Sequence, residues 1–135
     1  GPDEALLVQT EVPEDATYWS YQWYIYPWFE APDYANRQTH LTGDMMHVNA
    51  DGRVRMVFAH RDPGVPNWID TEGRSRGSIA YRYVGAKTAP APSSRVVAFE
   101  EIAESFPAGT PQVSAGERAE TIAKRREHVA RRFRR

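Results

Sequence analysis

Eleven consecutive residues, 60–70, hold most of the side chains that could carry chemistry in this sequence. They read HRDPGVPNWID and combine an imidazole, two carboxylates, an amide and an indole with two prolines and a glycine. Proline fixes φ, glycine accepts positive φ and aspartate bonds its own backbone, so we expect one rigid loop. Such a loop is typical of a binding site for a polar small molecule. The candidate binding residues are His60, Arg61, Asp62, Asn67, Trp68 and Asp70.

The same segment permits two other interpretations. His60 with Asp62 or Asp70 could act as base and acid in a hydrolase or lyase, if these groups face one water-accessible cleft. In a purely structural corner, Asp62 instead caps its own turn and Asp70 pairs with an arginine nearby in the sequence. The arginines in question are Arg61, Arg74 and Arg76. Carboxylates wholly engaged with turn amides and arginines would leave the enzyme without its acid or base.

The histidines raise the question of a metal site. His40, His47 and His60 would form one if the fold brought them together with a carboxylate, but their spacings match no metal-binding pattern. The carboxylates considered are Asp44, Asp62 and Asp70. The chain has no cysteine, which excludes disulfides, thiolate catalysis and cysteine-based metal sites. Because nucleotide-binding, serine-hydrolase and zinc-protease motifs are also absent, we predict no metal and no cofactor.

The segments that position this loop have the patterns of β-strands. Residues 17–29 place Trp19, Tyr21, Trp23 and Ile25 at alternate positions, which is typical of a strand with one buried face. We predict that this is the central strand of a sheet and that its aromatic side chains form core. A stacking platform for a sugar or another planar ligand is the functional alternative.

Other strands are predicted on both sides of this one. Strand-like runs occupy residues 5–12, 37–42, 77–85 and 95–99. Asp51-Gly52 suits a type I′ turn, so residues 46–50 and 53–59 are predicted to form a hairpin. Residues 100–106 are predicted to form one or two helical turns that end at Pro107.

The end of the chain is predicted to form an amphipathic helix. Ser114 and Glu117 have the spacing of a capping box, and apolar residues follow at a period near 3.6. Residues 117–135 carry eight basic and three acidic groups, whereas residues 1–116 carry nine and fifteen. We therefore expect the helix to dock on an acidic body rather than to bind nucleic acid. The predicted docking face is Ile122, Val129 and Phe133, with the arginines at its rim.

Strands followed by one helix predict an all-β to α+β fold, an antiparallel β-sandwich or jelly-roll-like domain with a C-terminal amphipathic helix. The length suits a single domain, 1–135. A strand that begins almost at residue 1 suggests the C-terminal domain or a fragment of a longer protein. No membrane span and no signal segment is recognisable in the sequence, which leaves the compartment open: soluble, cytoplasmic, or exported if the full-length protein carries a signal.

The chain resembles a bacterial family called domain of unknown function 1214. The resemblance covers nearly the whole chain and is carried by TYWS at 17–20, RQT at 37–39, DGRV at 51–54 and, above all, HRDPGVPNWIDT at 60–71. Members usually form the C-terminal part of a longer protein, often after domain of unknown function 1254, and two-domain members are often exported. The resemblance implies a β-sandwich-like fold with an added helix, but no reaction and no catalytic residues.

Together these features favour a binding or accessory domain. Its expected ligand is a small molecule that is polar, carbohydrate-like or amphipathic and is bound through Trp68 and nearby polar groups. In the other form of this prediction, the chain supports an N-terminal neighbouring domain or an oligomer partner. The alternative from a different class is the hydrolase or lyase based on His60.

Overall fold

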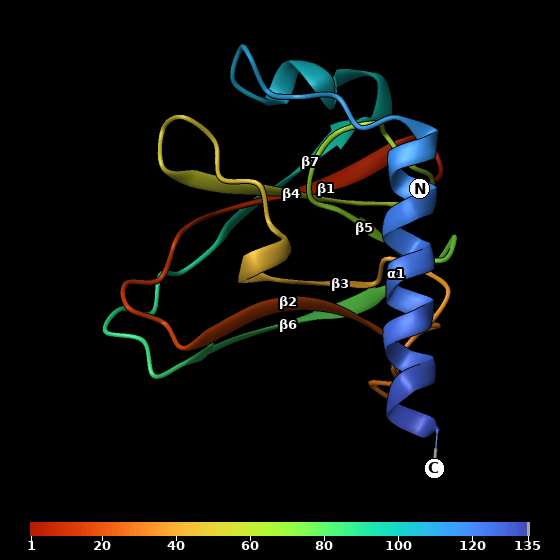
Figure 1. Ribbon diagram of the computed structural model, residues 1–135. Coiled ribbons are helices and arrows are strands. Elements are labelled where there is room, and N and C mark those ends of the chain that lie inside the picture. The colour runs from red at the N-terminus through yellow and green to blue at the C-terminus, as the bar shows by residue number, and fades with distance from the viewer. Residues whose placement is uncertain (135) are drawn as a thin grey trace.

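The computed structural model describes residues 1–134, which form two β-sheets and one long helix (Figure 1). The strands are β1 (Glu4–Glu11), β2 (Tyr18–Ile25), β3 (His40–Thr42), β4 (Arg53–Ala59), β5 (Trp68–Asp70), β6 (Gly77–Val84) and β7 (Ser93–Ala98). Three short 3-10 helices, η1 (Gly43–Met45), η2 (Phe99–Glu101) and η3 (Ala103–Ser105), precede the helix α1 (Ala115–Phe133).

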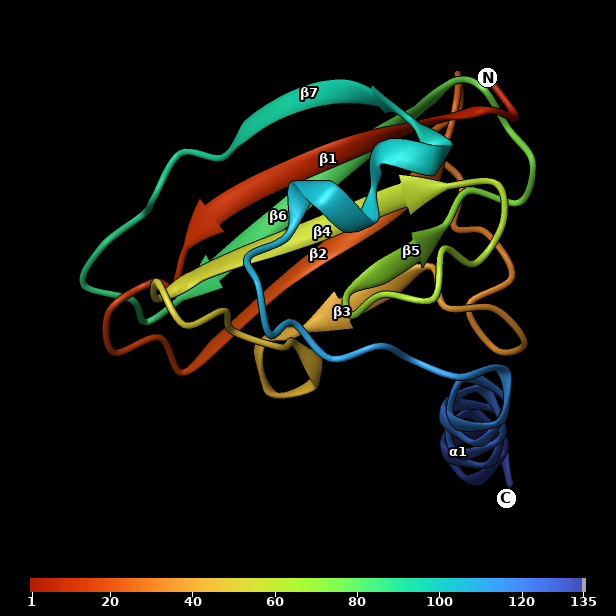
Figure 2. The ribbon, with the colours of Figure 1, turned by 90° about the horizontal axis from the view of Figure 1, so that it is seen from above.

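The two sheets are stacked on each other (Figure 2). The first sheet has the strand order β5-β4-β1-β7 and the second has the order β3-β2-β6. All neighbouring strands are antiparallel except β4 and β5, which are parallel. This α+β sandwich with a C-terminal helix confirms the predicted fold class. None of the helices that the structure describes is long and apolar enough to cross a membrane.

The alternating aromatic strand forms the core between the sheets, as predicted. β2 is the middle strand of the second sheet, and Trp19, Tyr21 and Trp23 pack in one buried cluster with residues of the first sheet such as Met56. Tyr21 and Met56 are completely buried. Because each large side chain contributes about 1.5–3 kcal/mol when it is buried, this cluster is the main source of stability.

The first sheet is buried on both faces. A second cluster lies on its outer face, where Leu7 of β1 and Val57 of β4 contact Ile102 and Phe106 from the segment that holds η2 and η3. The helical turns predicted at residues 100–106 therefore serve as a cover for this sheet. Burial on both faces explains why β1 and β4 read as nearly continuous apolar runs rather than as alternating ones.

The predicted hairpin at residues 46–59 is wrong. Residues 53–59 form β4, but residues 46–50 form no strand. The turn itself exists, because Gly52 has φ of +76° and its N–H donates to the Asn49 carbonyl at 2.9 Å. However, β1 pairs with one edge of β4, and on the other edge the Asn67 side-chain amide donates to the carbonyls of both His47 and Arg55. This side chain therefore takes the place of the backbone ladder that a hairpin would form.

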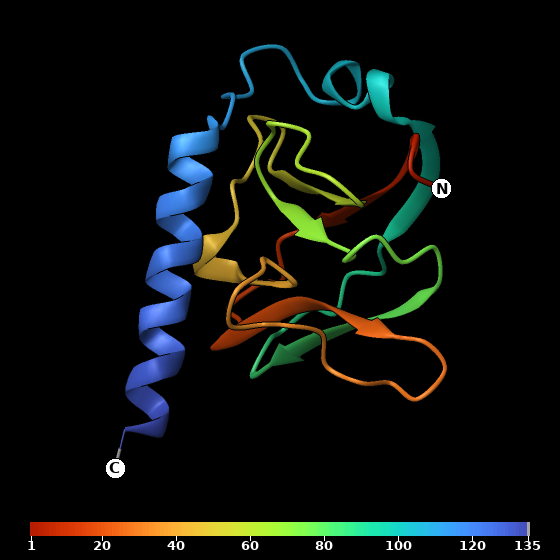
Figure 3. The same cartoon turned by 90° about the vertical axis from the view of Figure 1, so that its right-hand side faces the viewer.

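Helix α1 begins where it was predicted to begin. The Glu117 N–H donates to Ser114 Oγ at 3.2 Å, and the Ser114 N–H donates to Glu117 Oε2 at 2.8 Å, which completes the capping box. The helix runs across the edges of both sheets, and its last turns extend past the second sheet (Figure 3).

The predicted docking contacts of α1 are wrong in part. Phe133 is 71% exposed, and Ile122 and Val129 are only half-buried. The buried residues of the helix are Arg118 and Arg125, which share one face with Ile122 and Val129 and lie within the contact rather than at its rim. The apolar faces of the sheets are already covered, by each other and by the η2–η3 segment, so the helix lies along the sheet edges, where its two buried arginines bond to polar acceptors.

Candidate functional site

Asp62 connects the predicted loop to α1. Its Oδ1 accepts from the Gly64 N–H at 2.9 Å, and its Oδ2 accepts from Arg118 Nε at 2.8 Å. The same guanidinium donates to the Val65 carbonyl at 2.8 Å and lies 5.3 Å from the centre of the Trp68 ring. The Arg118 side chain is only 9% exposed, so the ion pair is largely shielded from water. Asp62 is thus a positioning residue for the helix.

Asp70 is engaged in the same way, by a turn amide and an arginine. Its Oδ1 accepts from the Glu72 N–H and its Oδ2 from Arg37 Nη1, both at 2.8 Å. This bond to Asp70 raises the pKa of Arg37. The arginine that pairs with Asp70 is therefore Arg37, which is distant in the sequence, and not Arg61, Arg74 or Arg76. With Asp62 also engaged, the two carboxylates named for a hydrolase or lyase are both committed to structural bonds.

Asn67 and Trp68 are buried and act in packing. Asn67 adopts φ of +57°, accepts from the His47 N–H at 2.8 Å and donates to the carbonyls of His47 and Arg55 at 2.8 and 3.0 Å. Trp68 belongs to the outer core cluster and donates from Nε1 to the Ala59 carbonyl at 3.2 Å. Because only 6% of Trp68 is exposed, its ring is a wall of the core rather than a surface for stacking a ligand.

His60 and Arg61 lie at the opposite end of the loop. His60 Nε2 lies 3.1 Å from the Arg74 carbonyl, and the ring lines a hollow at one end of the sandwich. Arg61 donates to the Pro2 carbonyl at 2.7 Å, and its guanidinium lies 3.8 Å above the Phe99 ring. The six predicted residues therefore point to different neighbours and do not share one cavity.

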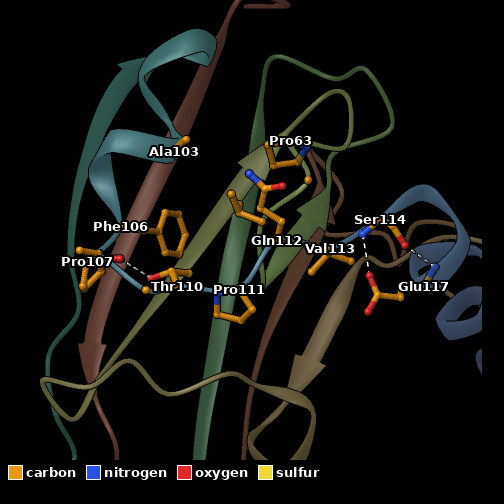
Figure 4. A pocket seen from close by; sticks show the side chains of 14 residues that line it. Pro63, Ala103, Phe106, Pro107, Thr110, Pro111, Gln112, Val113, Ser114 and Glu117 are labelled. Atoms are coloured by element: carbon orange, nitrogen blue, oxygen red, sulfur yellow. Dashed lines mark hydrogen bonds between the residues drawn. The ribbon is translucent and has the colours of Figure 1, made fainter.

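Between the loop and the segment leading to α1 lies a hollow of about 570 Å³ (Figure 4). The Thr110 hydroxyl donates to the Pro107 carbonyl at 2.7 Å, and Ser114 and Glu117 are bonded to each other in the capping box. Glu117 is the one charged residue of this lining. The hydroxyls and the carboxylate of this lining are thus already bonded within the chain, and Gln112 is exposed, so this hollow is a poor candidate for a binding site.

A larger groove of about 830 Å³ separates α1 from the edge of the second sheet. One wall is the helix, and the other comes from β3, the start of β2 and η1. Of the predicted site residues, Asn67 contributes to its lining. No pattern in the sequence indicates this groove, because its walls come from residues as much as a hundred positions apart.

The helical wall of the groove carries a basic row. Lys124, His128 and Arg132 follow one another at intervals of four residues, which places them on one face of α1. Within residues 1–134, none of the three forms an ion pair. The one acidic residue of the lining, Glu117, is used in the capping box. The groove therefore has a positive charge without a partner in the described chain.

The opposite wall is apolar and exposed. Tyr18, Tyr34 and Met45 are 42%, 40% and 54% exposed, respectively, and each lines the groove. Val129 adds an apolar contact from the helix. A groove with a basic row on one side and aromatic and thioether surface on the other suits a ligand with an anionic end and an apolar body.

His40 and Arg125 hold α1 at the base of this groove. Arg125 Nη1 donates to His40 Nδ1 at 2.8 Å, and Nη2 donates to the His40 carbonyl at 2.9 Å. Because a guanidinium only donates, the ring nitrogen accepts and the imidazole is neutral. Burial, followed by the positive charge of Arg125, lowers the pKa of His40 to about 4. Among residues 1–134, no group of three or more histidines and carboxylates is arranged to hold a metal ion.

Comparison with known proteins gives one informative result. A crystal structure of an uncharacterized protein from Burkholderia cenocepacia is similar to this chain, with a TM-score of 0.71 and 36% sequence identity. The match covers 76% of this chain and 28% of that one, and the two proteins are homologous. No protein-family model and no curated protein matches the chain. The resemblance to domain of unknown function 1214 therefore stays a prediction.

Proposed function

We propose that this chain is an accessory domain of a longer protein and that it binds a small amphipathic anion in the groove between α1 and β3. The observation that carries the proposal is the basic row Lys124, His128 and Arg132, which has no ion-pair partner in the described chain and faces exposed apolar side chains. A ligand with a carboxylate or phosphate head and an apolar tail matches both walls.

The chemistry of the walls favours the amphipathic class over the carbohydrate-like one. A sugar needs donors and acceptors along its whole length, whereas the wall opposite the basic row consists largely of apolar surface. Exposed ion pairs contribute only about 0–1 kcal/mol each, so contact with the tyrosines and Met45 would supply most of the affinity. Affinity should therefore rise with tail length and fall only modestly with added salt.

We also propose that the chain is the C-terminal domain of a longer protein and a member of the family called domain of unknown function 1214. Two observations support this: the loop string at residues 60–71, and the homologous crystal structure, in which the match spans 28% of the chain. The single-domain boundaries 1–135 belong to this proposal. Limited proteolysis of the full-length gene product should release a stable fragment with these boundaries.

A binding experiment with decanoate tests the groove. Titration calorimetry on the whole chain should detect decanoate and show about tenfold weaker binding of decanol, which has the same tail without the charge. Substituting Lys124→Glu and Arg132→Glu together should weaken decanoate binding by about tenfold or more, as the loss of two favourable contacts predicts.

The matched control is the pair Arg131→Glu and Arg134→Glu, which changes the charge of the same helix by the same amount outside the groove. This pair should leave the affinity within about twofold of the original. Equal weakening by both pairs would show non-specific attraction to a basic helix, and equal binding of decanol and decanoate would remove the anionic head from the proposal.

A further inference from the structure

The sandwich has an edge at each side of both sheets, and α1 lies along two of these edges. The edge strands are β5 and β7 in the first sheet and β3 and β6 in the second. Helix α1 runs beside β3 and β5 (Figure 2), and Arg125 donates to the His40 carbonyl of β3. Of the two remaining edge strands, β6 is the longer, with eight residues against six in β7. The edge of β6 therefore offers the longer ladder of free backbone groups.

Alternate residues of β6 point their backbone groups away from the sheet. The Val84 carbonyl accepts from the Thr17 N–H at 2.9 Å, so the backbone groups of Val84 point toward β2. In an antiparallel sheet this direction alternates along the strand, so Ile79, Tyr81 and Tyr83 point their N–H and carbonyl groups outward. Within residues 1–134, no other group forms a hydrogen bond with these outward-pointing groups. Each of the three residues thus presents a free donor and a free acceptor.

The strand β6 has few of the features that keep a free edge from pairing. Its sequence is GSIAYRYV, which has no proline and no lysine, and Arg82 is its one charged residue. The guanidinium of Arg82 is turned back over its own sheet, where Nη2 lies 3.4 Å from the Tyr24 hydroxyl of β2. Natural proteins usually protect a long edge with charges, prolines or bulges. An edge without them is typical of a strand that pairs with another strand.

Apolar side chains are exposed along the same edge. Tyr81 lies opposite the buried Tyr21 in the ladder, and the two rings are stacked with 5.3 Å between their centroids. Even so, Tyr81 is 47% exposed, because no strand lies beyond β6 in the sheet. Val84, at the end of the strand, is 52% exposed. A further strand at this edge would cover both side chains and add apolar burial to the backbone hydrogen bonds.

A second copy of β6 matches this edge in both chemistry and spacing. When a twofold axis passes beside Tyr81, the two Tyr81 residues lie opposite each other, and Ile79 lies opposite Tyr83 of the other copy. Every free N–H then meets a free carbonyl, and apolar side chains meet on the inner face. On the outer face Ala80 lies opposite Arg82 of the other copy, so no two like charges are directly opposed.

We propose that two copies of this chain associate through their β6 strands and form one continuous antiparallel sheet. The strand order across the contact is β3-β2-β6-β6-β2-β3, which leaves the two α1 helices at the outer ends. The groove proposed for the amphipathic anion lies at those ends, so the association does not depend on that ligand. A single strand pair buries less surface than a standard interface, so we expect a dissociation constant on the order of 10⁻⁴ M.

Sedimentation of the whole chain tests the association, and hydrogen exchange locates it. The chain should be largely monomeric at about 20 µM and largely dimeric at about 2 mM. In NMR exchange experiments, the amides of Ile79, Tyr81 and Tyr83 should exchange about fivefold more slowly in the concentrated sample. The amides of Ala80 and Arg82 point toward β2 and should be protected equally at both concentrations.

Substitutions at Ala80 test the register. Ala80→Arg places two arginines opposite each other in both halves of the contact and should weaken the dimer by about tenfold, whereas Ala80→Glu should strengthen it by about threefold or more. Combining Ala80→Arg with Arg82→Ala exchanges the members of the pair and should restore the original association.

The matched controls are Gln22→Arg and Gln22→Glu. Gln22 lies directly beside Ala80 on the same face, but in β2, inside the sheet. Both controls should leave the dissociation constant within about twofold of the original, since Gln22 does not face the other copy. Circular dichroism checks that each variant is folded.

A chain that stays monomeric at about 2 mM would overturn the proposal. Concentration-dependent protection of β7 instead of β6 would also overturn it and assign the contact to the other free edge. Equal effects of Ala80→Arg and Ala80→Glu, or equal effects of the Ala80 and Gln22 variants, would contradict the proposed register. The Lys124→Glu and Arg132→Glu pair should leave the dimer unchanged, and its loss in that variant would place the contact at the groove and overturn the proposal.

Discussion

The sandwich and the helix α1 are held in place by different chemistry. The sheets are joined by a dry cluster of large apolar side chains around Tyr21 and Met56. The helix is joined to the sheets by two guanidinium groups, Arg118 on Asp62 and Val65, and Arg125 on His40. The amphipathic pattern therefore located the docking face, but it did not reveal that arginines make the closest contacts on it.

The two arginines lie seven residues apart, which places them on nearly the same side of an α-helix. A guanidinium can satisfy several acceptors at once, so it suits a sheet edge rich in carbonyl and carboxylate oxygens. Ile122 and Val129 lie on this same side of α1 and are partly buried beside the arginines, and Val129 also lines the groove. The mode of docking thus creates the site proposed for the ligand.

The largest effect is expected in the sandwich. Met56→Ala should lower the free energy of unfolding by about 2–5 kcal/mol, because it leaves a cavity in a fully buried position. Urea denaturation measures this change. Val96→Ala, at a position that is 63% exposed, is the control and should change stability by about 0.5 kcal/mol or less.

The second-largest effect is expected at Arg118, the first of the two arginines that join α1 to the sheets. Arg118→Met should cost about 2–3 kcal/mol, because it leaves Asp62 and the Val65 carbonyl without their shared donor. Hydrogen exchange should then accelerate in α1 more than in β2. Protection of the helix equal to that of the unsubstituted chain would mean that packing, and not this guanidinium, holds it.

The third effect is a dependence of stability on pH, which arises at the contact between Arg125 and His40. The pKa of His40 is lowered from 6.5 to about 4, so between these values the unfolded chain binds more protons than the folded one. Stability is therefore greatest above pH 6.5 and falls as the pH drops toward 4. After allowance for partial exposure of the ring, the loss should reach about 1–2 kcal/mol.

An NMR titration of the His40 ring measures this pKa directly. Arg125→Met should raise it, but only part of the way to its usual value, because burial is the larger cause of the shift. A His40 pKa near 6.5 in the unsubstituted chain would contradict the proposed contact with Arg125.

The smallest effect is expected at the end of the predicted apolar stripe. Phe133→Ala should change the free energy of unfolding by about 0.5 kcal/mol or less, since the side chain is 71% exposed. Thermal unfolding should therefore show almost no shift for this variant. A loss as large as that of Arg118→Met would mean that Phe133 takes part in docking after all.

Local patterns in the sequence were enough to predict most of the elements. Alternating aromatics predicted β2, the Ser114–Glu117 spacing predicted the start of α1, and Asp62 with Gly64 predicted a turn closed by the aspartate. Each of these signals involves residues within a few positions of one another. Their geometry is therefore decided by backbone preferences and short-range hydrogen bonds.

The tertiary structure decided which elements meet. It placed the Asn67 side chain between residues 46–50 and β4, in place of the predicted hairpin ladder, and it paired Asp70 with Arg37. It also buried two arginines within the docking face of α1 and left the groove beside them. Such choices depend on competition between partners that are far apart in the sequence for a limited set of strand edges, acceptors and apolar faces, and no local pattern records the outcome.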